Sequence, residues 1–321
     1  MAIEQLEAAH SSFLSKSTIS RIKIFWSIAK ANGVVLSLND IIVLNSLDMT
    51  KDELKSAWSS CELDKKYSIS SGVMVSRNFQ ANRDEELDVQ TENLERLARA
   101  SSNISYARRF VALLLHDKWL KVAAISGSTS YLSVSREDDL DFFFVTNTGS
   151  MWISLVKSLL LARLFRLAEK NAPWLCMSCI VDEKYATKQF STPQDALFAR
   201  DAIAARVIKG EPHYVEILRR SGWMSSYFPK MYTARVSVAN QETQPKEENP
   251  EPSIASKIAN TFLYYTAGNY VRLKSNLLNR KFARQGERES LFYLKISRDH
   301  CIYESEGYLR LKKMYSGLKQ S

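Results

Sequence analysis

The sequence predicts a fold that combines helices and strands, α/β in the broad sense and α+β in the narrower one, in which a mixed sheet is flanked by helices. Short apolar segments of strand length alternate with longer segments in which apolar residues recur at helical spacing. The chain has 321 residues, 45% of them hydrophobic and 25% charged, which is the balance of a globular protein with a sizeable core. Helices that alternate with apolar strands pack in layers on a sheet, and this length allows about two or three domains.

Residues 1–80 are predicted to form a small helical domain that ends in a hairpin. Ser37-Leu-Asn-Asp40 opens one helix, and Thr50-Lys-Asp-Glu53 is a capping-box pattern that starts the next. Two short strands over 67–69 and 73–75 then flank a Ser-Ser-Gly turn. With a further helix in front, three helices and a hairpin follow the order of elements in a winged helix. This domain is therefore expected to be winged-helix-like.

Residues 81–238 are predicted to contain the central sheet and to form one catalytic core. A helix between two apolar strands, and a further apolar strand before them, indicate the layered arrangement. The expected elements are, in chain order, a polar helix from residue 81, a helix over 102–116, strands over 120–125 and 140–145, a helix over 150–170, a strand over 175–181 and a helix over 193–209.

Residues 239–253 are the predicted flexible linker, because they include three prolines and no large apolar side chain. Residues 254–321 are expected to form a basic, mainly helical region, with a long helix as far as Arg284, a strand over 291–296 and a helix over 307–318. The net charge of the chain is +9, and residues 255–321 contain 13 Lys and Arg against 5 Asp and Glu. This surplus fits a surface for nucleic acid, triphosphate or another anion, and it fits a solvated helix face equally well.

No membrane partner is expected from the sequence. The N-terminus lacks the apolar run of a secretory signal. The most apolar helical stretch, residues 151–168, is interrupted by Lys157, Arg163 and Arg166, whereas a spanning helix needs about 20 mostly apolar residues. It is therefore predicted to be a buried, amphipathic helix.

Cys176 and Cys179 form a C-x-x-C pattern within an apolar strand segment. A structural zinc site needs a second Cys or His pair at short spacing, and the four histidines are scattered. The two cysteines are therefore predicted to be buried strand residues. Free thiols, together with the absent signal, point to a cytoplasmic protein.

The stretch that indicates chemistry begins where the apolar strand 120–125 runs into Gly127-Ser128. A glycine at such a turn lets the backbone approach a phosphate, and exposed backbone N–H groups favour an anion. The Ser128 hydroxyl offers one more hydrogen bond. Gly127 and Ser128 are accordingly the candidate nucleotide-binding residues.

Asp139 and Asp141 open the next strand, which continues as Phe-Phe-Phe-Val. Residues two apart in a strand point to the same face, so the two carboxylates are expected to converge while Phe142 and Phe144 pack on the other face. A divalent cation offsets the repulsion between two such carboxylates, and magnesium prefers a few carboxylate oxygens plus substrate phosphate. Asp139 and Asp141 are therefore the candidate catalytic residues and ligands of Mg²⁺, with Mn²⁺ as an alternative.

A strand, Gly-Ser, a spacer of ten residues and Asp-apolar-Asp at the start of a strand together resemble the signature of the DNA polymerase β-like nucleotidyltransferase superfamily. The likeness extends to a minimal-nucleotidyltransferase-like branch that has a winged-helix-like region in front and a helical tail behind. Its further elements are Trp152, Leu175-Cys-Met-Ser178, Phe198-Ala-Arg-Asp201 and the stretch from Trp223 to Pro229. The resemblance implies a nucleotidyltransferase-type mixed sheet and metal-dependent transfer of a nucleoside monophosphate from an NTP.

One departure from that superfamily concerns its third carboxylate, which a neighbouring strand usually supplies. The strand 175–181 has Ser178 where an acid is expected, and Asp182 lies just beyond it. Asp182 is the remaining candidate for a third metal ligand, with a surface turn as its alternative role. Without a third ligand the chain is expected to bind one metal well, to turn over slowly or to be a nucleotide-binding relic.

Three functions remain open from the sequence. The first is a nucleotidyltransferase with an unidentified hydroxyl or phosphate acceptor. The second is a nucleic-acid-binding winged-helix regulator, which the mixed charges of the candidate recognition helix, residues 51–59, disfavour. The third is a catalytically inactive nucleotide sensor, which Ser178 suggests.

Overall fold

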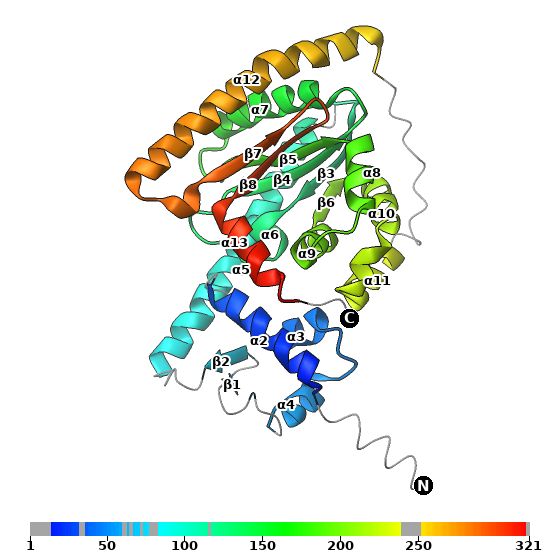
Figure 1. Cartoon of the computed structure of the whole chain (residues 1–321). Coiled ribbons are helices and arrows are strands. Elements are labelled where there is room, and N and C mark those ends of the chain that lie inside the picture. The colour runs from blue at the N-terminus through cyan, green and yellow to red at the C-terminus, as the bar shows by residue number, and fades with distance from the viewer. Residues whose placement is uncertain are drawn as a thin grey trace.

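A computed structural model of the chain describes residues 14–31, 36–59, 63, 67–70, 73–76, 83–114, 117–238 and 252–318. Its centre is a six-stranded mixed sheet with the order β6-β3-β4-β5-β8-β7 (Figure 1). The strands are β3 (Leu120–Ile125), β4 (Leu140–Thr146), β5 (Leu175–Asp182), β6 (Arg206–Lys209), β7 (Phe292–Ile296) and β8 (His300–Ser305). β4 and β5 are parallel, and every other neighbouring pair in this sheet is antiparallel. The α+β class expected from the sequence is confirmed.

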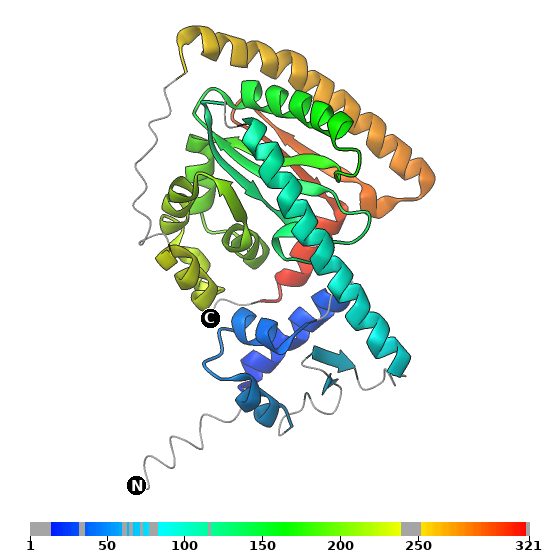
Figure 2. The same cartoon turned by 180° about the vertical axis from the view of Figure 1, so that it is seen from behind.

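Helices cover both faces of the sheet. One face packs against α5 (Arg83–Leu113), α7 (Met151–Ala168) and α12 (Ile254–Gln285), which lie together in the view from behind (Figure 2). The other face packs against α8 (Glu183–Ser191), α9 (Ala196–Ala204) and α10 (Glu211–Arg219). Side chains alternate along β4, so that Phe142 and Phe144 enter the first core while Phe143 and Val145 enter the second.

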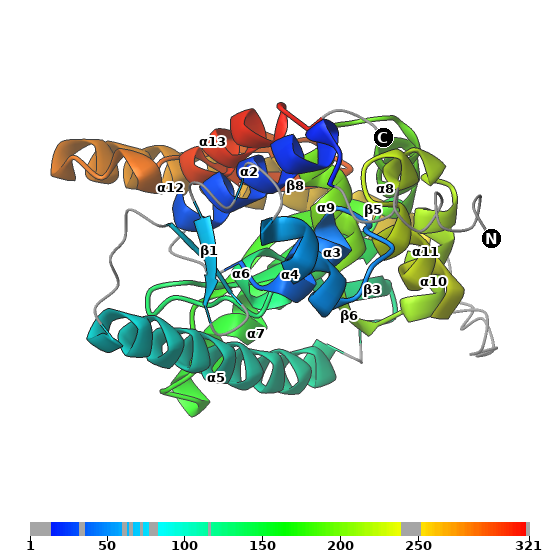
Figure 3. The ribbon, with the colours of Figure 1, turned by 90° about the horizontal axis from the view of Figure 1, so that it is seen from below.

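The N-terminal elements are α2 (Lys16–Ala31), α3 (Leu38–Leu44), α4 (Lys51–Ser59) and the hairpin of β1 (Tyr67–Ser70) with β2 (Val73–Ser76), seen from below in Figure 3. Both expected capping patterns form: Ser37 and Asp40 make a capping box, and Thr50 and Glu53 exchange the same bonds. The predicted order of three helices and a hairpin is therefore present.

The N-terminal region shares its core with the rest of the chain. The Phe25 ring lies 6.3 Å from the ring of Phe228, just before α11 (Pro229–Val238), and 6.1 Å from the ring of Tyr315 in α13 (Glu306–Tyr315). Between α10 and α11 the chain forms a short 3-10 helix, η2 (Gly222–Ser226), and a second one, η3 (Arg288–Ser290), precedes β7. The buried residues of α2 to α4 belong to the same apolar cluster as the sheet face that α8 to α10 cover.

The structure differs from the expected elements in several places, and the helices α8, α10 and α11 were not expected. The two helices expected over 81–116 form one helix, α5, and the helix expected over 193–209 is divided into α9 and the edge strand β6. The C-terminal region contributes β7 and β8 to the sheet, and β8 was not expected. Most of the predicted linker, residues 239–251, lies outside the described residues. No helix in the described part of the chain is long and apolar enough to cross a membrane.

Candidate functional site

The Gly-Ser turn follows β3 directly and forms the four-residue helix α6 (Gly127–Ser130). Ile125 pairs with Phe142 across the antiparallel strands, and the Ser126 N–H donates to the backbone oxygen of Asp141 at 3.0 Å. The Ser130 hydroxyl donates to the Gly127 carbonyl at 2.8 Å and closes the turn. The ladder between β3 and β4 therefore brings the turn to the start of the aspartate strand.

Gly127 lies against the carboxylate of Asp141. Its backbone φ is +62°, a conformation that residues with a Cβ rarely adopt. A Cβ added at Gly127 would lie 2.6 Å from Oδ2 of Asp141. Only a glycine fits both the conformation and the space, so the turn and the carboxylate are immediate neighbours.

Asp141 is a half-buried carboxyl group at the start of β4. Burial, followed by the charge of Asp139, raises the pKa of Asp141 to about 7. The neighbouring thiol of Cys176 and, to a smaller extent, the hydroxyl of Ser178 oppose this rise in pKa. In the absence of a cation, the site therefore holds a carboxyl group that ionises near neutral pH.

Asp139 lies one residue before β4 and its side chain is exposed. Partial desolvation, followed by the charge of Asp138, raises the pKa of Asp139, while Arg166 opposes the shift. The charge of Asp139 in turn contributes to the raised pKa of Asp141. This pair offers one half-buried and one exposed carboxylate.

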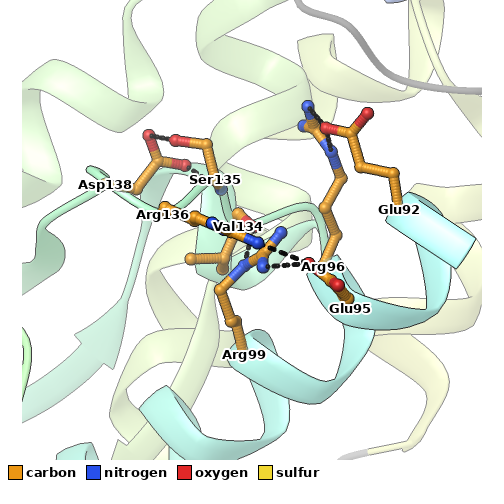
Figure 4. A network of polar contacts seen from close by, with 8 residues as sticks. All are labelled: Glu92, Glu95, Arg96, Arg99, Val134, Ser135, Arg136 and Asp138. Atoms are coloured by element: carbon orange, nitrogen blue, oxygen red, sulfur yellow. Dashed lines mark hydrogen bonds and ion pairs between the residues drawn. The ribbon is translucent and has the colours of Figure 1, made fainter.

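The loop in front of Asp139 is held against α5 (Figure 4). Arg99 donates through Nε to the Val134 carbonyl at 3.0 Å and pairs with Glu95 at 3.0 Å. Ser135 donates its N–H and its hydroxyl to the two carboxylate oxygens of Asp138, at 2.8 and 2.6 Å. The carboxylate of Asp138 is therefore held by Ser135 within the loop. Because the loop is anchored to α5, the position of Asp139 at its end is fixed.

Neither expected position supplies a third carboxylate beside this pair. On the parallel strand β5, Cys176 pairs with Asp141, and the hydroxyl of Ser178 two residues later donates to the Phe142 carbonyl at 3.1 Å. Asp182 pairs with Thr146 at the opposite end of the same strands, so the structure does not bring it to the carboxylate pair. Asp182 instead caps α8 by accepting from the Tyr185 N–H at 2.9 Å. Among the described residues, no group of three or more His, Cys, Asp or Glu is arranged to hold a metal ion.

A partly buried polar network that the sequence did not single out adjoins the turn. Tyr131, the residue after α6, donates its hydroxyl to Asp201, and Arg200 stacks over the Tyr131 ring at 4.0 Å. Arg200 also donates to the hydroxyl of Tyr315 in α13. Burial raises the pKa of Asp201 to about 6, against hydrogen bonds from Tyr131 and Tyr308. The sequence signal that could have indicated this network is the adjacent Arg200 and Asp201 in the otherwise apolar helix α9.

A separate cavity of about 320 Å³ lies beside the edge strand β6. Its charged lining consists of Arg108, Arg206, Arg235 and Glu211, of which the last two form an ion pair at 2.8 Å. Arg206 also donates through Nε to the Ser130 carbonyl at 2.9 Å, which ties this cavity to the end of α6. Neither aspartate of the candidate site lines it, so the carboxylate pair, and not the cavity, defines the site.

Comparison of the chain with family models, with curated proteins and with solved structures finds no match.

Proposed function

We propose that the chain is a nucleotidyltransferase that moves a nucleoside monophosphate from an NTP to a hydroxyl or phosphate acceptor. The observation that carries this proposal is the contact between Gly127 and Asp141, with 2.6 Å between an added Cβ and Oδ2. A triphosphate must touch a phosphate-binding turn and a metal-binding carboxylate at once. Gly127 and Asp141 are close enough for one triphosphate to reach both the turn and the carboxylate.

The residues divide into two roles in this proposal. Gly127 lets the backbone approach the phosphates, and Ser128, half-buried at the turn, offers a hydroxyl donor. Asp139 and Asp141 would hold Mg²⁺ or Mn²⁺, because two carboxylates plus substrate phosphate suit a hard cation. Bound there, the cation would neutralise charge on the phosphates during transfer. The raised pKa of Asp141 fits this role, since a cation replaces the proton that burial otherwise favours.

A nucleotide sensor without catalytic activity is the second candidate, and Ser178 supports it. Ser178 stands where the superfamily's third carboxylate is expected, and its hydroxyl donates to the Phe142 carbonyl. The nucleic-acid regulator has weaker support. Lys55 of the candidate recognition helix pairs with Asp52 of the same helix at 3.2 Å, which reduces the positive charge available to phosphates.

The test is Asp141→Asn, examined by thermal shift with each NTP, with and without magnesium, and by pyrophosphate release. Wild-type protein is expected to gain stability only when both ligands are present, by mass action. The variant is expected to lose this gain and the release of pyrophosphate, because a neutral amide attracts the cation weakly. Glu137→Gln is the matched control, since Glu137 is an exposed carboxylate in the same loop.

The outcomes separate the candidates. Stabilisation without pyrophosphate release for any acceptor supports the sensor. An Asp141→Asn variant that responds like the wild type in both assays removes Asp141 from the site and overturns the proposal.

A further inference from the structure

The outward face of α12 is apolar although it is open to solvent. Ile258, Phe262, Tyr265, Leu273 and Leu277 are each more than half exposed, while Val271 and Gly268 on the opposite face are buried. An isolated exposed apolar residue is ordinary, but a series of large ones along a single helix indicates a surface that is covered in function.

α7 adds a second apolar stripe beside the first. Leu160, Leu164 and Leu167 are spaced at helical intervals and are also more than half exposed. The two helices lie together on the outside of the sheet (Figures 1 and 2). Arg163 of α7 donates to the Tyr270 hydroxyl of α12 at 3.5 Å, so the outer sides of the two helices meet.

The pair of helices is a fixed platform. Oδ1 of Asn260 in α12 accepts from the Trp152 N–H at 2.7 Å and so caps the first turn of α7. A Cβ at Gly268 would lie 3.4 Å from the Trp152 ring, which shows how closely α12 approaches. The exposed apolar stripes therefore belong to helices that are packed in place.

The charged side chains of α7 and α12 are all positive. α12 contains six Lys and Arg over 32 residues and α7 contains three over 18, and neither helix has an Asp or Glu. Arg280, Lys281 and Arg284 line a shallow hollow of about 370 Å³ together with Leu277. Cations therefore lie beside exposed aliphatic and aromatic side chains along the outer helix.

We propose that the outer face of α7 and α12 docks on an anionic phospholipid surface. Basic residues beside exposed Leu, Ile, Phe and Tyr match the headgroup region of a bilayer, which combines negative charge with an apolar layer beneath it. A single-stranded nucleic acid would use aromatic rings for base stacking, and exposed Leu and Ile offer it no comparable contact. This inference departs from the sequence-based expectation that the chain has no membrane partner. It requires no spanning helix.

The experiment is flotation of the full chain with vesicles of phosphatidylcholine alone and of phosphatidylcholine mixed with phosphatidylserine. Binding is expected only to the mixed vesicles and should weaken with added salt, since the cations contribute through a screened surface potential. The double variant Arg280→Gln/Arg284→Gln is expected to lower the partition coefficient roughly fivefold per cation removed. Phe262→Gln combined with Leu164→Gln should lower it more than about tenfold, because the apolar contact is lost.

The control is Leu94→Gln, which changes an equally exposed leucine on α5 and should leave vesicle binding unchanged. Three results would overturn the proposal. The first is equal binding by all variants. The second is no vesicle binding together with a dimer, measured by sedimentation, that Phe262→Gln dissociates, which would make this face an interface between two copies. The third is no vesicle binding together with salt-sensitive RNA binding that the arginine variants lose.

Discussion

At the scale of single residues, Gly127 meets two separate requirements at one position. Its backbone has a φ of +62°, and its missing Cβ leaves the space that Oδ2 of Asp141 uses. Gly286 at the end of α12 meets only the first requirement, because its φ is +77° and no atom lies within 4 Å of an added Cβ. The two glycines therefore allow backbone strain to be separated from a collision with the site.

Gly127→Ala is expected to lower the free energy of unfolding by about 2–4 kcal/mol, adding overpacking to backbone strain. Gly286→Ala should cost only about 1 kcal/mol, from the backbone alone. Urea denaturation measures both values. In thermal shift assays Gly127→Ala should also lose the response to magnesium and triphosphate, whereas Gly286→Ala should keep it. Equal costs and an intact response in both variants would contradict the placement of the turn.

At the scale of elements, α5 anchors the loop that leads to Asp139. Arg99 donates to the carbonyl of Val134, which is buried, and so fixes the loop from outside (Figure 4). Arg136 belongs to the loop itself, but its side chain is 81% exposed and its pairing with Glu95 is longer, at 3.5 Å. Only the first contact is expected to determine where the loop lies.

Arg99→Ala is expected to lower the free energy of unfolding by about 1–2 kcal/mol, because a buried carbonyl loses a charged donor. Arg136→Ala should change it by less than about 0.5 kcal/mol, as exposed ion pairs do. The magnesium-dependent thermal shift should shrink in Arg99→Ala and persist in Arg136→Ala. A larger loss in Arg136→Ala would show that the loop is positioned differently.

The sequence predicted the elements that local pattern determines. β3, β4 and β5 are continuous apolar runs with clear ends, so their predicted bounds differ from the observed ones by at most one residue. β6 and β8 were missed because both are short or partly polar, and their strand state depends on pairing with distant residues. The neighbourhood of Gly127 and Asp141 followed from spacing along one hairpin, whereas the network around Asp201 joins segments that only the folded chain brings together.

At the scale of the whole molecule, the Asp201 network connects the turn to α9 and to the C-terminal helix α13. Tyr131, Arg200 and Tyr315 come from three distant parts of the sequence and meet around one partly buried carboxyl group, Asp201. Because burial raises the pKa of Asp201 to about 6, the folded state keeps this proton at a pH where the unfolded chain has released it. The stability that this group contributes is present below about pH 4 and is lost as the pH rises through 6.

Asp201→Asn is therefore expected to gain stability relative to the wild type as the pH rises from 4.5 to 7.5, by roughly 2 kcal/mol. The comparison uses the difference in unfolding free energy between the two proteins at each pH, so that other titrating groups cancel. Urea denaturation at both pH values gives this difference. A difference that stays constant between them would show that Asp201 ionises in the folded state as it does in the unfolded chain.

Strand β5 obtains its outer neighbour from much later in the chain, since Cys179 pairs with Ile302 and Val181 with His300. A ribosome that has just released β5 has therefore made three adjoining strands of the sheet while one side of β5 lacks its partner. For that interval an apolar strand offers unpaired backbone N–H and C=O groups to any other nascent chain. We therefore expect aggregation to increase when many copies of this chain are synthesised at once.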